Sequence, residues 1–477
     1  MQKHYRTFLF LLGISVLLEA VIISRGFYSI SADDSSRSII AYNLLLGKLP
    51  PDLDWLPIHS LINAAALLIY NDLFWTPRII SIVFGVLSLI AVYQLANEFF
   101  QDKRIIKLTY LIAVFYPIRV MFSVTPLTEI MFAFFVTEAF VYFIRWHREK
   151  IYRHLLISSL FFTLSAGVRY EGWLFSFAFV LAVVILYKKE FTRIPLQKLV
   201  YIFLVASAMP VLWMCLHWLY YGNPFSFVSG PHNLYENLTH GSILLRLKYN
   251  FVTNFVFQVL AYLIFPGLVF LIRNFKKNTT ITLFLIIWGI SVFIIALMSV
   301  TGHGNPSHAF WRVPFAWTFL LIPFMAAQLI QWSDQKYIPQ MAGLIIVIVF
   351  LPLFYLSQIY FLTKNSPFSV SEKRTGDYLA SQIEKKPSAK ILIEPADWNY
   401  LHVEVASRHP ECFVYDTDEQ MIRPHTFNFT KESMLTLLKE KKIFLITVYN
   451  NSSKKMISDL GLKKVDSFAQ WSVYKVE

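Results

Sequence analysis

The chain has 477 residues, of which 56% are hydrophobic, 17% aromatic and only 15% charged. A soluble protein of this length could not bury so much apolar surface, so the composition indicates a multi-pass membrane protein. The formal charge of +13 is attributed to basic loops beside membrane helices, not to nucleic-acid binding. Cys215 lies in an apolar segment and Cys412 in a polar tail, so we expect no disulfide between them.

Apolar runs long enough to cross a hydrocarbon core of ~30 Å recur between residues 8 and 362. They predict about eleven transmembrane helices, at residues 8–24, 76–96, 107–123, 126–144, 154–168, 172–187, 198–220, 250–272, 279–300, 313–331 and 338–362. The first run lacks a small-residue cleavage motif after it and is predicted to stay as an uncleaved span. The run at 58–70 is too short to cross and is predicted to be an outer interfacial or re-entrant helix.

The basic residues predict the orientation of the chain in the membrane. With the N-terminus inside, 17 lysines and arginines fall in short cytoplasmic loops and nine on the opposite side. This asymmetry agrees with the positive-inside rule. It places the C-terminal tail outside, and the compact loops favour a prokaryotic plasma membrane.

The tail differs from the preceding sequence, because its charged fraction rises and its apolar runs shorten. We therefore predict a transmembrane domain at 1–362 and a small extracytoplasmic α/β domain at 363–477. Its predicted elements are strands at Lys390–Glu394, Cys412–Tyr415 and Ile443–Val448 and helices at 371–386 and 430–441, the second with Thr430 as N-cap. No glycine-rich phosphate loop occurs in the tail, so we assign it no chemistry.

The segment 31–60 carries four aspartates between strongly apolar sequences. Carboxylates in such surroundings are costly unless they face water or have a function. The adjacent pair Asp33-Asp34 follows the first crossing directly and precedes helix-like sequence. Most Asp-Asp pairs in loops are simply solvated, but this position favours a role on a lipid-borne substrate.

The predicted topology gathers the other unusual polar residues on the outer side as well. They are Asp52, Asp54, His59, Arg78, Arg119, Glu129, Arg169, Tyr170, Glu171, His232, His303, His308 and Arg312. A cavity lined in this way could bind an anionic phosphate among arginines and histidines while a carboxylate acts as base.

Simpler interpretations stand beside this one. Arg169 and Glu129 could form a structural ion pair, and single loop histidines mostly have no chemical role. Asp52-Leu53-Asp54 has the spacing of a metal-binding DxD motif, but so short a pattern is common by chance and a divalent metal is not favoured. Glu19 and Glu138 lie within predicted helices and are expected to be satisfied by neighbouring helices.

Several motifs in order resemble the GT-C superfamily of polytopic glycosyltransferases, most of all its protein mannosyltransferase and aminoarabinose transferase branch, which is glycosyltransferase family 39-like. The motifs are Asp33-Asp34, Ala41–Gly47, Leu56-Pro57-Ile58-His59, Arg78, Pro126–Glu129, Arg169–Trp173, Arg312-Val313-Pro314 and Pro323. The resemblance spans roughly residues 1–331, and the order and spacing of the motifs carry it.

The resemblance implies roles for individual residues. Asp33 would be the general base on the acceptor hydroxyl, and Asp34 would orient Asp33 or the acceptor. Arg312 would bind the donor phosphate. Further donor-phosphate candidates are Arg169, His59, Arg78 and His308, and Glu129 and Glu171 are supporting candidates. The aminoarabinose branch often has a lysine before its first-loop prolines where this chain has Trp55, and His59 or Arg78 could substitute for it.

We therefore expect a glycosyltransferase that moves one sugar, mannose or another hexose, from a polyprenyl-phosphate donor to a glycan, lipid or protein acceptor. The resemblance implies inversion at the sugar and no nucleotide or other cofactor. A transporter or lipid flippase is the alternative, although the sequence shows no internal repeat and no paired broken helices. A scaffold that binds partners through its tail would leave the first-loop aspartates unexplained.

Overall fold

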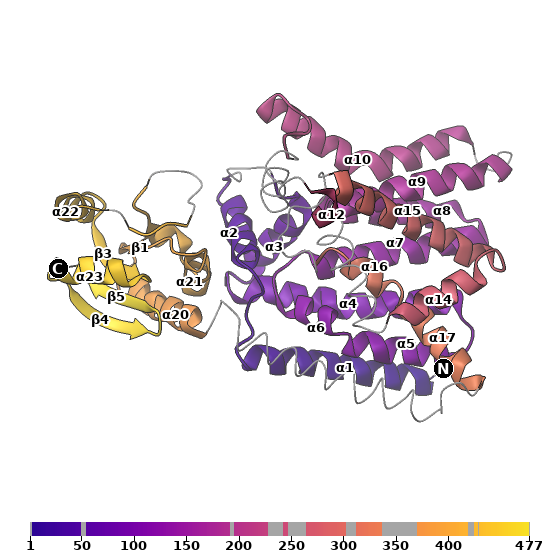
Figure 1. Cartoon of the computed structure of the whole chain (residues 1–477), viewed down its shortest axis with the longest axis horizontal. Helices are drawn as coiled ribbons and strands as arrows, with labels where there is room; N and C mark the ends of the chain where they lie inside the picture. Colours follow the sequence, from indigo (N-terminus) through magenta and orange to yellow (C-terminus); the bar gives the residue numbers. More distant parts are fainter. Residues whose placement is uncertain are drawn as a thin grey trace.

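The computed structural model describes residues 2–48, 54–190, 195–227, 242–246, 264–301, 312–335, 370–417, 424–427 and 429–476. It is mostly helical, and a small sheet lies in the C-terminal part (Figure 1). The helices before the sheet are α1 (Gln2–Ser24), α2 (Asp33–Leu45), α3 (Pro57–Ile69), α4 (Trp75–Phe99), α5 (Lys103–Phe115), α6 (Pro117–Val124), α7 (Glu129–Glu149), α8 (Tyr152–Val168), α9 (Glu171–Glu190), α10 (Leu196–Tyr221), α12 (Ile243–Arg246), α14 (Phe265–Asn274), α15 (Thr279–Thr301), α16 (Phe315–Phe319) and α17 (Ile322–Asp334).

Among the described residues, five helices are long and apolar enough to cross a membrane, or six if the bent pair α5–α6 is one span. The five are Trp75–Phe99, Glu129–Glu149, Leu196–Tyr221, Thr279–Met298 and Phe315–Asp334. The chain is therefore an integral, multi-pass membrane protein, as predicted. The predicted number of eleven spans is not confirmed, and the run at 338–362 lies outside the described residues.

Two predicted spans are interrupted at prolines. The run predicted at 107–123 is broken between α5 and α6, which are bent by 52° relative to each other. Pro117 begins α6; it has no N–H to continue the hydrogen bonds of α5 and restricts Tyr116 to extended backbone. The run predicted at 313–331 is divided into α16 and α17, with Pro323 in the first turn of α17.

Helix α7 lies in the interior of the helical part. The ring of Phe140 on α7 contacts the rings of Phe162 on α8, Phe175 on α9 and Phe284 on α15. Aromatic rings in such tilted and edge-on arrangements pack closely and add specific contacts to the core. The first residue of α7, Glu129, is buried as well.

The C-terminal part is an α/β unit that we call the C-terminal unit, residues 370–476 as described. Its elements are α20 (Val370–Lys385), β1 (Lys390–Ile393), α21 (Tyr400–Ser407), β2 (Phe413–Val414), α22 (Lys431–Glu440), β3 (Ile443–Val448), α23 (Asn451–Asp459), β4 (Lys463–Phe468) and β5 (Trp471–Lys475). The strand order is β2-β1-β3-β5-β4, and β1 is parallel to both of its neighbours. The three predicted strands and two predicted helices are confirmed, and Thr430 caps α22 by accepting the Ser433 N–H.

Alternation along the strands gives this sheet two apolar faces. Ile391 and Ile393 pack with residues of α20 and α21 in one core. Leu392 between them packs with residues of α22 and α23 in a second core. Sequence analysis missed α21, α23, β4 and β5, and the predicted boundary after residue 362 lies outside the described residues.

The short helices α2 and α3 lie between the long helices and the C-terminal unit (Figure 1). α3 confirms the short helix predicted at 58–70. α2 is followed closely by Gly47, whose φ of +71° favours glycine and ends the helix. The start of α4 also meets the C-terminal unit, and we call this contact region, together with that of α2, the junction. Asp72 caps α4 there, because its Oδ1 accepts the N–H groups of Phe74 and Trp75. Its Oδ2 accepts a hydrogen bond from Arg408 Nε of the C-terminal unit at 2.8 Å.

Candidate active site

Asp33 begins α2 and faces the helical part of the molecule. Its Oδ2 lies 2.6 Å from Nη1 of Arg312, which precedes α16. The two residues are 279 positions apart in sequence, so the tertiary fold brings them together. This contact is the outer end of a longer series of charged side chains.

The series continues inward from Arg312 by alternating charges. Arg312 Nε donates to Glu129 Oε1 at 2.5 Å, and Arg169 Nη1 donates to the same oxygen at 2.6 Å. Arg169 also donates through Nε and Nη2 to the two oxygens of Glu171, at 3.1 and 2.6 Å. We call these five residues, Asp33, Arg312, Glu129, Arg169 and Glu171, the charged cluster.

Helix ends explain why these residues meet. Glu129 begins α7 and Glu171 begins α9, where the positive end of each helix dipole favours a carboxylate. Arg169 lies in the short turn from α8 to α9. Gly172 permits that turn, because a Cβ there would come within 2.5 Å of backbone atoms of Ser165 and Ala166.

The members of the charged cluster differ in their contact with water. The side chain of Asp33 is 37% exposed, whereas those of Arg312 and Glu129 are 4% and 1% exposed. Buried charges of this kind are tolerated because each has an opposite charge at hydrogen-bond distance. Asp33 is therefore the end of the cluster that a molecule arriving from outside could reach.

Arg37 is a residue that sequence analysis missed. Its guanidinium carbon lies 4.2 Å from the centre of the Trp55 ring. Its Nε and Nη1 are buried and have no hydrogen-bond partner in the described part of the chain. Buried unpartnered donors are costly, and at a candidate site they suggest a missing acceptor. Because Arg37 follows Asp33 by four positions on α2, both side chains lie on the same helix face.

The cations of the site remain charged at neutral pH. Burial would lower the pKa of Arg312, but the Glu129 and Asp33 carboxylates outweigh it and hold that pKa above its ordinary value. Burial, opposed by Asp33, lowers the pKa of Arg37 to about 10. Burial and the nearby Arg37 charge together lower the pKa of His59 to about 3, so this ring is neutral. His59 could therefore offer a phosphate only an uncharged hydrogen bond.

Asp34 points away from the charged cluster and is fully buried. Its Oδ2 accepts the Ser29 hydroxyl at 2.7 Å and the Ile30 N–H at 2.9 Å, which holds the loop between α1 and α2. Burial, opposed by these hydrogen bonds, raises the pKa of Asp34 to about 6. The two adjacent aspartates thus have different surroundings.

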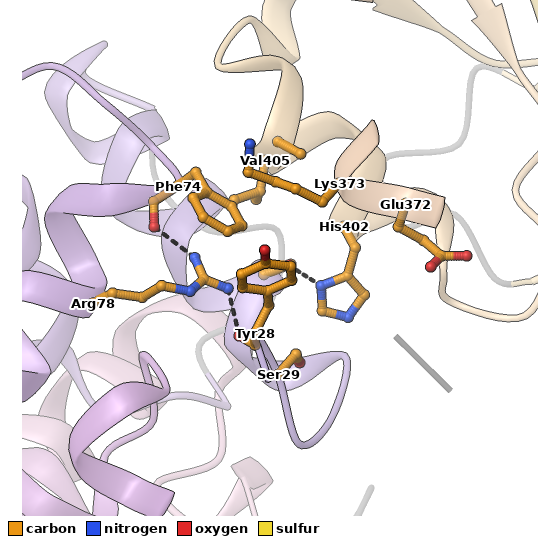
Figure 2. Close-up of a pocket in the computed structure, with 10 residues that line it drawn as sticks. Tyr28, Ser29, Phe74, Arg78, Glu372, Lys373, His402 and Val405 are labelled. Atoms are coloured by element: carbon orange, nitrogen blue, oxygen red, sulfur yellow. Dashed lines mark hydrogen bonds between the residues drawn. The ribbon is translucent and has the colours of Figure 1, made fainter. Parts of the chain in front are cut away.

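Other candidates lie elsewhere. Arg78 donates to the carbonyl oxygens of Phe74 and Tyr28 beside the C-terminal unit, not to the charged cluster (Figure 2). Arg119, expected on the outer side, is buried against Glu19 of α1 at 3.0 Å, so Glu19 has the helix partner that we predicted. Glu138 likewise accepts a hydrogen bond from Gln94. The candidates Asp52, His232, His303 and His308 lie outside the described residues.

Within the described ranges, no group of three or more His, Cys, Asp and Glu side chains is arranged to hold a metal ion. Asp54 is described, but its partner in the DxD motif is not. The expectation that no metal takes part in the reaction therefore stays a prediction.

The chain is similar to known proteins in part of its sequence and in its fold. Residues 51–218 match the family model of dolichyl-phosphate-mannose-protein mannosyltransferase. Two solved structures of ArnT from Cupriavidus metallidurans share the fold along nearly the whole length of both chains. The structure bound to undecaprenyl phosphate has a TM-score of 0.62 at 12% identity, and the apo structure 0.63 at 11%; each comparison covers 98% of this chain and 97% of the other. Comparison with curated protein sequences finds no significant match.

The expected resemblance to the protein mannosyltransferase and aminoarabinose transferase branch agrees with this family match and with the fold shared with ArnT. The family match includes Arg78, Glu129, Arg169 and Glu171, but it leaves out Asp33, Arg37 and Arg312. The inclusion of those three residues in the candidate site therefore rests on the geometry of the charged cluster and of α2.

Proposed function

We propose that this chain is a glycosyltransferase that moves a single sugar from a polyprenyl-phosphate donor to a hydroxyl acceptor. One observation carries the proposal. A reachable carboxylate, Asp33, and a guanidinium whose buried Nε and Nη1 have no partner among the described residues, Arg37, share one face of α2 beside Arg312. Such a site supplies a base for the acceptor and cations for the phosphate that leaves.

The reaction is a single displacement. The acceptor oxygen forms a bond to the sugar C1 while the bond from C1 to the phosphate oxygen breaks, so the configuration at C1 inverts. The hydroxyl proton passes to Asp33. The electron pair of the breaking bond stays on the polyprenyl phosphate, whose added negative charge Arg37 and Arg312 stabilise.

Arg312 changes partners in this mechanism. In this structure its Nη1 is bound to Asp33 Oδ2 at 2.6 Å. A donor phosphate competes with Asp33 for the same guanidinium, and its arrival releases the carboxylate to accept the acceptor proton. Glu129 keeps Arg312 in place during the exchange through the Nε contact.

Arg37 takes the phosphate contact that the sequence comparison left open. The aminoarabinose branch often has a lysine where this chain has Trp55, and Arg37 stacks on that tryptophan. Stacking holds a planar guanidinium with its N–H groups at the edge, where a phosphate can accept two of them. Arg37 thus replaces His59 and Arg78 as the substitute for the lysine.

The donor class follows from two comparisons. A similar fold binds undecaprenyl phosphate in a solved ArnT structure, and the matched family model is that of a dolichyl-phosphate-mannose-dependent enzyme. Polyprenyl-phosphate-linked mannose or another hexose is therefore the donor to try first. The distribution of basic residues supports an acceptor on the outer face of the membrane. A transporter or lipid flippase is not favoured, because the matched family is one of sugar transferases.

The experiment reconstitutes the full chain in vesicles with radiolabelled polyprenyl-phosphate sugars and an extract of outer-face acceptors. Transfer of label to an acceptor, with release of polyprenyl phosphate, supports the proposal. Movement of intact labelled lipid across the bilayer without release of its phosphate would contradict it and support a flippase.

A further inference from the structure

Helix α2 has two faces with different partners. At 100° per residue, Asp33 and Arg37 lie on one face and Ser35 lies nearly opposite them. The first face meets the charged cluster and Trp55. On the opposite face, Ser35, Ile39 and Tyr42 follow at spacings of four and three residues, and all three contact the C-terminal unit.

The contact nearest to Asp33 is a buried hydrogen bond. Ser35 Oγ lies 2.6 Å from His402 Nδ1 of α21, and both residues are buried. One turn further along α2, Ile39 packs against the apolar core on that face of the sheet. Two turns further, at the exposed rim, the Tyr42 hydroxyl donates to Glu411 Oε2 at 2.9 Å.

A second set of contacts holds α20 and α21 to the start of α4. The Phe74 ring has Arg78 at 3.9 Å and Lys373 of α20 at 4.7 Å. Figure 2 shows these residues together with His402 around Tyr28. Cations on an aromatic ring are attracted to it most strongly where water is excluded. The ion pair between Arg408 and Asp72 lies beside them.

The junction is packed and is no substrate site. The cavity lined by Arg78, Ser35 and His402 has a volume of about 10 Å³, which is room for about one water molecule. A displacement of α21 is therefore passed directly to α2 through side chains already in contact.

We propose that the C-terminal unit is a positioning element of the active site, and that His402 acts through Ser35 to hold Asp33 and Arg37 in place. This inference rests on the proposed function, because the placement of Asp33 and Arg37 affects activity only if both residues act in the transfer. His402 and Ser35 are positioning residues, since neither contacts the charged cluster. The unit thereby acquires a function that its own sequence, with no phosphate loop, does not indicate.

The first test follows α2 directly and needs no ligand. Hydrogen exchange of the full chain is measured for wild type, Ser35→Ala and His402→Ala. We expect exchange in residues 33–45 to rise about 10-fold, the effect of losing one buried hydrogen bond, with no change in α7. Ser453→Ala is the matched control, because it removes a buried hydroxyl from Glu394 on the far side of the same unit. Unchanged exchange in α2 for both variants, or an equal rise for Ser453→Ala, would overturn the proposal.

The second test uses undecaprenyl phosphate as the probe and a double-mutant cycle. His402→Ala is expected to weaken its binding about 10-fold, and the pair Arg37→Ala with His402→Ala should bind no worse than Arg37→Ala alone. His402→Gln should recover part of the lost affinity for undecaprenyl phosphate, because its amide can form a hydrogen bond with Ser35. Additive losses would mean that His402 acts on the fold at large and would refute the coupling.

The two tests separate two kinds of failure. If the wild type binds no undecaprenyl phosphate while exchange in α2 responds as expected, the proposed function is wrong and the positioning role stands. If binding is normal but α2 is indifferent to Ser35 and His402, the positioning role is wrong and the proposed function stands.

Discussion

The helical part contains two buried groups of arginine and glutamate side chains. One is formed by Arg119 and Glu19, and the other is the charged cluster. Around Arg119, every guanidinium nitrogen has a partner: Nε and Nη2 donate to the carbonyls of Ala113 and Val114, Nη1 donates to Glu19, and Nη2 also donates to Ser15. The charged cluster instead ends at the half-exposed Asp33, and Nε and Nη1 of the neighbouring Arg37 have no partner within the described ranges.

The difference distinguishes a structural ion pair from a site. In the closed group around Arg119 every guanidinium nitrogen is used inside the protein, so an anionic ligand has nothing to gain there, although Glu19 Oε2 has no partner among the described residues. An open group retains donors that only an incoming acceptor can satisfy. Arg119 was expected among the outer polar residues, yet its complete set of partners assigns it to structure. Four changes, two within these groups and two beside the charged cluster, test the distinction.

Asp33→Asn should have the largest effect on activity. We expect transfer to fall about 100- to 10,000-fold, because the amide cannot take the acceptor proton. Arg312 keeps its contact with Glu129, so thermal stability should stay near that of the wild type, and undecaprenyl phosphate should bind at least as tightly because the carboxylate that competes for Arg312 is gone. The measurements are initial transfer rates, unfolding temperature and binding. Near-normal transfer rates would exclude Asp33 as the base.

Arg119→Leu should have the largest effect on stability. Removing one partner of a buried ion pair leaves an uncompensated carboxylate on Glu19 and costs about 3–5 kcal/mol. Thermal unfolding in detergent, followed by circular dichroism, measures the loss. The double change with Glu19→Leu is the control and should recover part of it. A single variant as stable as the wild type would show that this closed group is not structural.

Arg37→Ala should weaken binding of undecaprenyl phosphate about 10- to 100-fold, which corresponds to one or two hydrogen bonds to a charged group. Arg37→Lys should bind undecaprenyl phosphate with an affinity between those of the wild type and Arg37→Ala, since lysine keeps the charge and loses the planar fork of the guanidinium. The fold should be unaffected, because these donors have no partner among the described residues. Equal affinity in all three proteins would remove Arg37 from the site.

Asp34→Asn should have the smallest effect on transfer and on donor binding, and it should change mainly the pH dependence of stability. Because burial raises the pKa of Asp34 to about 6 from an ordinary 3.8, the folded wild type holds this proton more tightly than the unfolded chain. The stabilisation of the folded state by this proton is complete below pH ~4. The free energy of unfolding then falls by about 1.4 kcal/mol per pH unit as the pH rises to ~6. Unfolding temperatures between pH 4 and 7 should show a decline that the variant lacks. The same decline in both proteins would contradict the assignment.

Several members of the site could be predicted from sequence, because membrane topology brings helix ends together. Glu129, Arg169 and Glu171 lie at ends of α7, α8 and α9, so counting spans is enough to place them on one side. The places of Asp33 and Arg312 could also be predicted, because Asp33 follows the predicted span 8–24 and Arg312 directly precedes the predicted span 313–331. Arg37 was missed, although its spacing of four from Asp33 was visible, because only the structure shows that its Nε and Nη1 are buried without a partner in the described part of the chain.

Other errors have physical causes as well. Arg119 was placed with the outer residues because one span was expected at 107–123, and the break at Pro117 was not recognised. In the C-terminal unit, β3 was predicted from its continuous apolar run. β4 was not, because it lies at an edge of the sheet with mostly exposed side chains and reads as polar sequence.

Asp72 has a consequence for how the parts of the protein depend on each other. One of its oxygens completes the first turn of α4, while the other holds Arg408. Detaching the C-terminal unit would disturb the same carboxylate that anchors a membrane-crossing helix. The carboxylate of Asp72 therefore ties the folding of the first turn of α4 to the attachment of the C-terminal unit.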